Sequence, residues 1–459
     1  MKSLSLSENQ SFSNFKKEFY LRFPDIRLFD CGQYNLIKVI LDGLKVNYNH
    51  QGVIVYRQFK WYTRLYNYLK FVTLKKAENC VNSKYIFLDN LREVKKNGKE
   101  VSFYSDNFES FLRSKEKSIS IYKRIRHGVL FHDGIDINYK RYSNDTKETE
   151  RVKTDCINLL KSLENHFTPD DFKNVRFAVE LFYMEFKKWF NELVKTRTKT
   201  AFVICHYHNE GFIAAAHSLG IKTIELQHGI ISEMDIFYCL PEVIKKTNKD
   251  TLFCNEIWVF GEYWKQKLLK GFEYSKEQIS VFGFYPVISN DELNWTLKER
   301  EFIKSYKNLY LITSQTKMHK DFISAIEKWS QEEGDIFQTI GFLFKLHPNE
   351  KLQDYQVLHE FDNILFTPEN ASLSSLFGIV KGNITSYSTT IYDALKYGVK
   401  SYSIVTPHSI DYVSELVVEG LTTEIVSLET LLLDQSNVKA DIAHYFSKPL
   451  WNKLVRTVK

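Results

Sequence analysis

Short apolar runs alternate with amphipathic segments from residue 201 onward. Four of them, AFVICHY (201–207), IKTIELQ (221–227), EIWVFG (256–261) and ISVFGF (279–284), predict buried parallel strands. The segment HNEGFIAAAHSLG between the first two runs predicts a helix that Asn209 opens and Gly220 ends. This strand–helix–strand order is the building block of doubly wound α/β sheets.

The same alternation returns after residue 300. The predicted strands are NLYLITSQ (308–315), GFLFKLHP (341–348), NILFTP (363–368), GNITSYS (382–388) and SYSIV (401–405), with helices between them. Two successive blocks predict an α/β protein with two Rossmann-like domains, at residues 1–284 and 301–459, joined by a linker at residues 285–300. Ligands of such sheets bind at the carboxyl ends of the strands, so the polar residues there are the candidates for function.

The first 200 residues carry fewer clear patterns. KYIFL (84–88) predicts a strand, and VSFYSDN from Val101 and GVLFHDG from Gly128 indicate two more strand-to-turn passages. The segment 145–198 has no glycine and predicts two or more helices inserted in the first domain. One helical face of this segment collects the apolar residues Val175, Val179, Phe182, Phe186, Trp189 and Leu193.

Charge and cysteine usage narrow the function classes. The 62 basic and 56 acidic residues leave a net charge of +6, a small excess over 459 residues that does not suggest a nucleic-acid-binding face. Six scattered cysteines without CxxC spacing predict buried free thiols in a reducing compartment. The N-terminal residues contain no apolar signal segment, and no apolar run approaches the ~18 residues that cross a bilayer. We therefore expect a cytoplasmic protein.

The densest group of hydroxyl side chains is TSYSTT (385–390), which lies between a predicted strand and the helix IYDALKYG. Hydroxyl groups and main-chain N–H groups at the beginning of a helix suit the phosphate of a nucleotide. The alternative is that a single Ser or Thr caps the helix.

A second candidate is the sequence Lys345-Leu346-His347-Pro348 at the end of a predicted strand. Pro348 stops the strand, which places His347 at the carboxyl edge of the sheet, beside the hydroxyl-rich loop. An imidazole there would neutralise phosphate charge on a leaving nucleotide. The alternative is a surface histidine without a ligand.

A third candidate, Gln227-His228-Gly229, follows a strand of the first domain. Gly229 permits a turn that brings main chain close to a ligand. His206, His208 and His228 together suggest a metal site, but a His-x-His pair with one distant histidine is weak evidence, and we expect no metal. The alternative for His228 is a turn residue without a ligand.

Several common motifs are absent from the sequence. It contains no P-loop, no GxGxxG, no GxSxG and no Asp-x-Asp motif for a metal-bound sugar nucleotide. These absences count against P-loop nucleotide hydrolysis, redox cofactor use and esterase chemistry.

The three candidates together resemble a known group of proteins. A Gln-His-Gly after one strand, a Lys-x-His-Pro after a later strand, and a Ser/Thr-rich turn before an Asp/Glu-Ala-Leu-x-x-Gly helix resemble bacterial surface-polysaccharide glycosyltransferases of the GT-B fold. Capsule-type Kdo transferases are most similar, with teichoic-acid glycerophosphotransferases and bacterial sialyltransferases more distant. The resemblance covers residues 201–405.

The resemblance implies two Rossmann-like domains that face each other across a cleft, with the acceptor on the first domain and the nucleotide-sugar on the second. It also implies a final helix that crosses back to the first domain. The residues it implies for donor binding are His347, Pro348, Ser386, Ser388, Thr389 and Asp393, and those it implies elsewhere in the cleft are Gln227, Gly229 and Lys345. Asp393 stands where the group more often has Glu, and Val399-Lys400 replaces the usual Pro after the glycine.

The function that the resemblance implies is sugar transfer from a nucleotide donor, a CMP-activated acidic sugar such as Kdo, to a surface polysaccharide or lipid-linked glycan. The nucleotide-sugar is a substrate, and no cofactor is expected. One alternative on the same scaffold transfers glycerol phosphate from CDP-glycerol. Another is a non-catalytic subunit that binds glycan or nucleotide.

An inverting sugar transfer needs a base in the first domain that takes the proton of the acceptor hydroxyl. Glu210 opens the helix after AFVICHY, although a helix dipole alone also favours an acid there. His228 is its main competitor because an imidazole titrates near neutral pH. Asp89, Asp133 and Glu225 are further candidates.

The C-terminal sequence HYFSKPLWNKLVRTVK is basic and carries no acid. Its apolar residues Leu450, Trp451, Leu454 and Val458 lie on one helical face, which favours a helix packed on the first domain and is also compatible with an amphipathic helix at the inner membrane surface.

Overall fold

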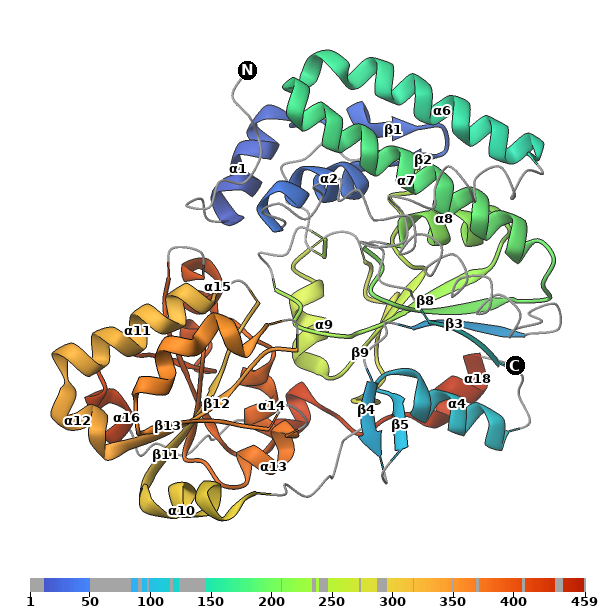
Figure 1. Cartoon of the computed structure of the whole chain (residues 1–459). Coiled ribbons are helices and arrows are strands. Elements are labelled where there is room, and N and C mark those ends of the chain that lie inside the picture. Colours follow the sequence, from blue (N-terminus) through green and yellow to red (C-terminus); the bar gives the residue numbers. More distant parts are fainter. Residues whose placement is uncertain are drawn as a thin grey trace, which may run out of the picture. The chain divides into compact units, whose positions relative to one another are not determined.

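The computed structural model describes residues 12–49, 84–89, 93–96, 99–115, 119–123, 145–207, 209–232, 237–238, 247–271, 274–286, 295–316, 318–348, 350–368, 371–406, 409–433 and 441–457. The chain forms two compact units (Figure 1): unit 1 comprises residues 1–93, 102–286 and 446–459, and unit 2 comprises residues 94–101 and 287–445. The sequence predictions for Asp133, His208, the passage from Gly128, and linker residues 287–294 lie outside the described residues.

Unit 1 is built on a six-stranded parallel sheet with the order β10-β9-β8-β7-β3-β6. Its strands are β3 (Tyr85–Asp89), β6 (Ile119–Lys123), β7 (Thr200–Ile204), β8 (Lys222–Leu226), β9 (Glu256–Val259) and β10 (Ile279–Val281). In chain order the sheet grows from β3 to β6 on one side and then through β7 to β10 on the other. This reversal creates a topological switch point between β3 and β7.

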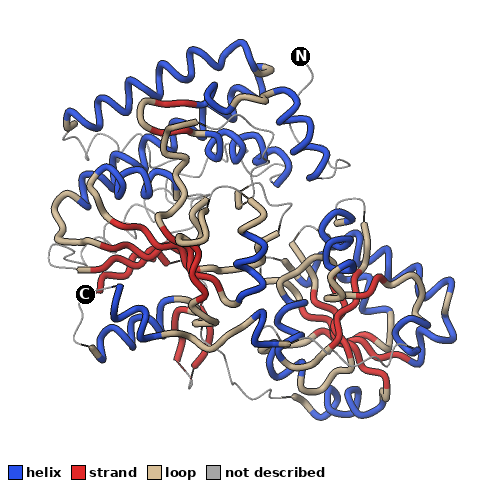
Figure 2. Tube along the Cα trace, turned by 180° about the vertical axis from the view of Figure 1, so that it is seen from behind, coloured by secondary structure: helices blue, strands red, loops and turns tan. Residues whose placement is uncertain are grey.

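Two layers of helices cover one face of this sheet (Figures 1 and 2). Helix α8 (Glu210–Ser218) follows β7, and the long helix α7 (Pro169–Leu193) packs on α8, with α2 (Ile37–Asn49) and α6 (Lys147–Leu163) against α7. Gly211 allows the close approach of α7 and α8, because a Cβ at this position would lie 2.5 Å from Cβ of Glu185. The remaining N-terminal elements are α1 (Phe12–Arg22), η1 (Ile26–Phe29), β1 (Asp30–Cys31) and β2 (Tyr34–Asn35).

Aromatic residues fill the other face of the unit 1 sheet. Phe108 of α4 (Ser105–Ser114) contacts Phe87 of β3 and Phe202 of β7, with ring centroids 5.6 Å apart in both pairs. Trp451 of the C-terminal helix α18 (Trp451–Thr457) stacks on Phe111 at 5.0 Å. Leu454 of α18 is fully buried. The chain therefore returns from unit 2 to unit 1, where Trp451 and Leu454 of α18 pack on the unit 1 core.

Unit 2 is also built on a six-stranded parallel sheet, with the order β13-β12-β11-β14-β15-β16. Its strands are β11 (Asn308–Thr313), β12 (Ile340–Lys345), β13 (Ile364–Phe366), β14 (Gly382–Thr385), β15 (Lys400–Ser403) and β16 (Thr423–Glu424). In chain order this arrangement is 3-2-1-4-5-6, the order of the dinucleotide-binding Rossmann sheet, and its switch point lies between β11 and β14.

Alternate residues of the unit 2 strands enter two separate cores. Tyr310, Ile312 and Phe344 belong to the core under α11 (His319–Glu332), α12 (Gly334–Thr339), η5 (Leu352–Glu360) and α16 (Glu429–Leu433). Leu311 and Leu343 belong to the core under α10 (Leu297–Ser305), α13 (Leu373–Phe377) and α14 (Thr390–Lys396). Helices α15 (Ile410–Val418) and α17 (Ile442–Tyr445) complete the unit. Burial on both faces explains why β11 and β12 are nearly continuous apolar runs in the sequence.

The predicted fold class, α/β with two Rossmann-like units, is confirmed by the two sheets. The N-terminal helices, the β1–β2 pair and strand β6 were not predicted. Two further elements, β4 (Glu93–Lys96) and β5 (Lys99–Ser102), form a two-stranded ribbon after β3. Within the described ranges, every helix is too short or too polar to cross a membrane.

Candidate functional site

The switch point of unit 2 lies between the residues that follow β11 and those that follow β14. Residues 314–316 follow β11 and residues 386–389 follow β14, so two polar loops lie at this switch point, the position of the ligand crevice in such sheets. In open α/β sheets this crevice is where a ligand binds. The β12 loop, which contains His347, follows the strand next to β11.

The last residues of four neighbouring strands form a polar row at the edge of this crevice. The register pairs Thr313 with Lys345, and Thr385 with Ser403, while Ile312 pairs with Ile384 one level below. In β11 and β12 the residues before this row are apolar and buried, so in these two strands the row marks the change from core to polar edge. Thr385 Oγ1 donates to the main-chain oxygen of Thr313 at 2.9 Å, which ties β14 to β11.

His347 is half-buried and is held by two residues that follow β11. Its Nδ1 lies 2.9 Å from Thr316 Oγ1, and its main-chain N–H donates to Ser314 Oγ at 2.8 Å. The structure therefore places His347 at the carboxyl edge of unit 2, with its ring and its main chain both oriented by the β11 loop. Pro348 follows it and is exposed.

Glu350 lies beside His347 and was not among the candidates from the sequence. Its carboxylate accepts hydrogen bonds from Ser314 Oγ at 2.5 Å and from Tyr355 OH at 3.0 Å, and its main-chain N–H donates to the carbonyl of His347 at 2.9 Å. Burial raises the pKa of Glu350, and the hydrogen bonds from the Ser314 and Tyr355 hydroxyls oppose this rise. Burial likewise raises the pKa of Tyr355.

The hydroxyl residues that follow β14 differ in accessibility. Ser386 is fully buried, and its Oγ donates to the carbonyl of Ile404 at 3.0 Å. Ser388 is half-buried and its Oγ accepts from the main-chain N–H of Thr390 at 3.3 Å, a local turn just before the N-cap residue Thr389 of α14. Thr389 is exposed at the beginning of α14. The structure thus turns Ser386 toward β15 and leaves Ser388 and Thr389 at the crevice.

Two further predicted residues lie on the same unit. Lys345 ends β12 and is half-buried in the polar row. Asp393 lies in α14, where its carboxylate is 3.0 Å from Lys396 Nζ, an ion pair one helical turn along. The pair places Asp393 on the half-buried surface of α14, and no nucleotide contact can be assigned to it from these distances.

Two buried polar atoms near this edge have no hydrogen-bond partner. They are Oε1 of Gln315, two residues after β11, and Oγ1 of Thr367, directly after β13. Buried polar atoms are nearly always paired with protein, water or ligand. Gln315 and Thr367 therefore mark the β11–β13 side of the edge as a place where a polar ligand or ordered water completes the hydrogen bonding.

Unit 1 carries its own group of polar residues at the carboxyl edge of its sheet. Asp89 ends β3 at the switch point and is almost fully buried, with its Oδ2 accepting from Ser105 Oγ at 2.6 Å and from Ser102 Oγ. Cys205, directly after β7, has a φ of +69°, which is unusual for a residue with a side chain. Its thiol donates to the carbonyl of Tyr207 at 3.1 Å, and this bond supports the turn.

The residues Gln227, His228 and Gly229 form the loop after β8. The Gln227 amide donates to the Gly229 carbonyl at 2.8 Å and accepts from the main-chain N–H of Phe260 at 2.7 Å. Gln227 is fully buried, so its side chain shapes the loop and is not presented to solvent. His228 is half-buried, and its Nε2 lies 3.2 Å from Tyr207 OH.

Glu210, the other candidate base, begins α8 and is only 5% exposed. Its Oε1 is buried without a hydrogen-bond partner. The fully buried Lys38 lies in its field: burial lowers the pKa of Lys38, and the carboxylate of Glu210 is the strongest opposing influence. The Lys38 ammonium donates to the carbonyl of Leu252 at 2.7 Å and lies 4.0 Å from the centre of the Phe253 ring. Glu210 thus belongs to the interior of unit 1.

Glu225 and His206 form a buried pair next to this edge. His206 Nδ1 lies 2.7 Å from Glu225 Oε2, and His206 Nε2 lies 2.7 Å from the carbonyl of Phe237. A carbonyl only accepts, so Nε2 carries a proton. Burial disfavours ionised Glu225, but His206 and the hydroxyl of Tyr238 prevail and hold the pKa of Glu225 below its usual value. Glu225 is therefore a fully buried structural acid.

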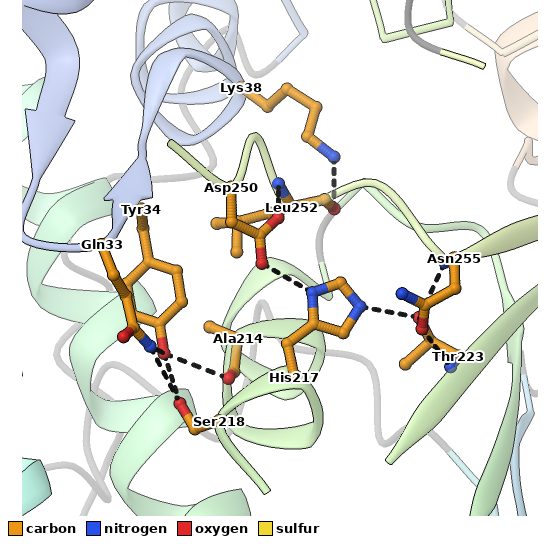
Figure 3. Close-up of polar contacts among 10 residues, drawn as sticks. All are labelled: Gln33, Tyr34, Lys38, Ala214, His217, Ser218, Thr223, Asp250, Leu252 and Asn255. Carbon is orange, nitrogen blue, oxygen red and sulfur yellow. Dashed lines mark hydrogen bonds and ion pairs between the residues drawn. The ribbon is translucent and has the colours of Figure 1, made fainter. Parts of the chain in front are cut away.

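A second histidine–carboxylate pair lies at the opposite edge of the same sheet (Figure 3). His217, in the last turn of α8, has Nδ1 2.6 Å from Asp250 Oδ2 and Nε2 2.9 Å from Thr223 Oγ1. Asn255 joins this network through its Oδ1, which accepts from the main-chain N–H of Thr223 at 2.8 Å. Thr223 is the second residue of β8 and is fully buried, so this Asp–His–Thr arrangement joins α8 to the sheet and has no accessible nucleophile.

The described residues contain no group of three His, Cys, Asp or Glu side chains arranged to hold a metal ion. His206 and His228 bond to different partners, and His208 lies outside the described ranges.

No model of a known protein family matches the sequence, and no curated protein matches it. Among solved structures the chain is similar to S. aureus MnaA with UDP, at 12% identity, 76% of this chain, 86% of that chain and a TM-score of 0.46. It is similar to the UDP-GlcNAc 2-epimerase of Methanocaldococcus jannaschii with UDP-GlcNAc and UDP, at 14% identity, 82% and 99% coverage and a TM-score of 0.46. The wall teichoic acid polymerase TagF with CDPG follows at 11% identity, 75% and 79% coverage and a TM-score of 0.31. These likenesses say nothing of the reaction of this chain.

The structure adds residues to the predicted site of unit 2. Ser314, Gln315 and Thr316 follow β11, and Glu350 and Tyr355 reach the same edge. The sequence did carry a signal for the first three, because they are consecutive polar residues after an apolar run. Glu350 comes three residues after His347, and only the turn between them shows that it faces back to the β11 loop.

Proposed function

We propose that this protein is a metal-independent glycosyltransferase that uses a nucleotide-sugar donor. The observation that carries the proposal is the carboxyl edge of the unit 2 sheet, whose strand order is 3-2-1-4-5-6. The loop with Ser388 and Thr389 lies at the switch point, and His347 follows the neighbouring strand β12 and contacts Thr316 of the β11 loop. A half-buried imidazole and hydroxyl groups at the carboxyl edge suit the phosphate of a nucleotide. The partnerless atoms Gln315 Oε1 and Thr367 Oγ1 support a polar ligand there.

The finer part of the proposal comes from the sequence resemblance. It favours a CMP-activated acidic sugar such as Kdo as donor, and a bacterial surface polysaccharide or lipid-linked glycan as acceptor. An acidic sugar adds a carboxylate to the phosphate of the donor, and a cationic or hydrogen-bonding crevice suits both charges.

In the proposed reaction the acceptor hydroxyl loses its proton to a base and its oxygen forms a bond to the anomeric carbon of the sugar. The bond from that carbon to the phosphate oxygen breaks, and the nucleotide leaves with the electron pair. His347 and the hydroxyl groups of the crevice would stabilise the charge that develops on the phosphate oxygen. The chain itself would therefore supply what a metal ion supplies in other nucleotide-sugar enzymes.

For the base, the contacts favour His228 over Glu210, and Asp133 stays a candidate outside the described residues. His228 is half-buried and lies in the loop after β8, next to the hydroxyl of Tyr207. Glu210 is 5% exposed and lies in the field of Lys38, which leaves it little access to an acceptor. A base must reach the proton that it removes, directly or through one water.

Release of free nucleotide from candidate donors tests the proposal. We expect release from CMP-Kdo in the presence of a glycan acceptor, and loss of release in His347→Ala. Release from CDP-glycerol and not from CMP-Kdo would identify the glycerol phosphate transferase that the sequence leaves as an alternative. Nucleotide binding without turnover on any donor would support a non-catalytic binding subunit and contradict the proposed reaction.

A further inference from the structure

The loops after β11 and β12 are joined by a short chain of hydrogen bonds that ends on a carboxylate. Glu350 accepts from Ser314 Oγ at 2.5 Å, and Ser314 Oγ in turn accepts from the main-chain N–H of His347 at 2.8 Å. A serine hydroxyl has one proton to donate, and here it goes to the carboxylate. The direction of both bonds is therefore defined, from His347 through Ser314 to Glu350.

Glu350 is itself fixed by two other contacts. Tyr355 OH donates to its Oε1 at 3.0 Å, and its own main-chain N–H donates to the carbonyl of His347 at 2.9 Å. Tyr355 belongs to η5 and is fully buried in the core of unit 2, so it supports the carboxylate of Glu350 rigidly. Glu350 thus contacts the His347 segment twice, once directly and once through Ser314.

The position of the His347 ring depends on the same two loops. Thr316, which lies two residues after Ser314, has its Oγ1 2.9 Å from Nδ1 of the His347 ring. If the β11 loop moves, both its main-chain contact and its ring contact with His347 change.

We propose that Glu350 is a positioning residue for the nucleotide site: through Ser314 it holds the β11 and β12 loops in the register that presents His347 to a phosphate. Glu350 needs no contact with the ligand for this role. A carboxylate near an anionic phosphate would otherwise weaken binding by repulsion, which makes its presence beside His347 informative. This inference rests on the proposed nucleotide site of unit 2.

A double-mutant cycle tests the inference. The measured quantity is the dissociation constant of the nucleotide that the wild type binds tightest among CMP, CDP, UMP and UDP. We expect Glu350→Ala and Ser314→Ala each to weaken binding about tenfold. Because both variants break the same chain of bonds, the double variant should bind no more weakly than the weaker single variant. Glu350→Gln keeps an acceptor for Ser314 and should bind within about threefold of the wild type.

Glu333→Ala is the matched control. Glu333 lies between α11 and α12 of the same unit and is half-buried. Its carboxylate accepts a hydrogen bond from the main-chain N–H of Leu428 at 2.8 Å. Its removal should lower the melting temperature and leave nucleotide affinity unchanged. A stability loss in Glu350→Ala without an affinity loss would show a merely structural role and overturn the inference.

The remaining outcomes are also decisive. If the affinity losses of Glu350→Ala and Ser314→Ala multiply in the double variant, Glu350 does not act through Ser314 and the inference is wrong. If Glu350→Ala binds more tightly than the wild type, repulsion prevails over positioning and the inference is also wrong. If the wild type binds none of the four nucleotides, the proposed function and this inference fail together.

Discussion

Nδ1 of His347 lies 2.9 Å from the hydroxyl oxygen of Thr316, so a residue after β12 is oriented by a residue after β11. The two strands are neighbours in the sheet, and β11 also borders the switch point of unit 2. The contact therefore connects His347, which the sequence predicts to bind phosphate, to the switch point where Rossmann sheets bind their ligands. It also shows that the site is assembled from separate loops, each of which can be tested by itself.

The sequence predicts that Ser386 binds the nucleotide-sugar donor. Its buried contacts instead predict that it contributes to stability and not to nucleotide binding. Its Oγ donates to the carbonyl of Ile404 and is shielded from solvent. We expect Ser386→Ala to lower the free energy of unfolding by about 0.5–1.5 kcal/mol, the contribution of one hydrogen bond, with nucleotide affinity unchanged. Ser388→Ala is the comparison, with a small loss of affinity. Denaturant unfolding and nucleotide titration of both variants test this. A larger loss of affinity in Ser386→Ala than in Ser388→Ala would contradict the prediction.

The partnerless Oε1 of Gln315 predicts a contact with a ligand group that donates a hydrogen bond. Gln315→Leu should weaken nucleotide binding about five- to thirtyfold, because the hydrogen-bonding N–H or O–H group of the nucleotide would lose its acceptor. Inorganic pyrophosphate, which has no base or ribose, should bind to the variant and the wild type equally. Equal loss for the nucleotide and for pyrophosphate would instead assign Gln315 to the phosphate. Unchanged nucleotide binding would leave water as the partner of Oε1.

The two candidate bases can be separated by paired variants. A residue that acts as general base contributes about 10²–10⁴-fold to the rate, so His228→Ala should lower kcat by that factor while the nucleotide still binds. Glu210→Gln keeps the shape of Glu210, and we expect it to retain most of the activity because Glu210 is buried. Loss of kcat in Glu210→Gln at full nucleotide affinity would reverse the assignment.

The His217–Asp250 pair of unit 1 predicts an acid-sensitive contribution to stability (Figure 3). Burial raises the pKa of Asp250, but the His217 contact and the N–H of Leu252 prevail and lower it below the ordinary value. The contribution of this carboxylate is therefore fully present above the unfolded value of about 3.9 and is lost as pH falls through the lower folded value.

For Asp250→Asn we expect a loss of about 1–2 kcal/mol in the free energy of unfolding at pH 7, and a smaller loss at pH 3. The exposed Asp362 provides the control, since Asp362→Asn should change stability by less than about 0.5 kcal/mol at both pH values. A deficit of Asp250→Asn that stays constant between pH 7 and pH 3 would contradict the acid-sensitive contribution of Asp250.

The parallel sheets could be predicted because strands buried on both faces are apolar runs, as in 201–207 and 341–348. His347 could be predicted because Pro348 marks the end of its strand. The predicted strand 308–315 extended two residues too far: β11 ends at Thr313, and Gln315 belongs to the loop. The pattern of apolar residues does not define such strand ends, because Ser and Gln can form the last residues of a strand or the first residues of a loop.

Other features depend on contacts between distant segments. The fold-back of Glu350 onto Ser314 joins residues that are far apart in sequence, and no periodicity reports it. The burial of Ser386 arises from its neighbour β15, and the sequence alone presents it as one hydroxyl among several. Strand β6 and the N-terminal helices were missed because their apolar residues are interrupted by polar ones.

The most direct test of the account is calorimetric titration of wild type and His347→Ala with CMP, CDP, UMP and UDP. We predict that a cytidine nucleotide binds the wild type. Loss of a hydrogen bond to a charged phosphate costs about 1.5–3 kcal/mol, so we predict affinity about ten- to a hundredfold lower in His347→Ala. Its melting temperature should fall only by the small amount that the contact of the ring with Thr316 contributes. Tight binding of a uridine nucleotide alone would redirect the donor. If none of the four nucleotides binds, or if His347→Ala binds as tightly as the wild type, the central claim is contradicted.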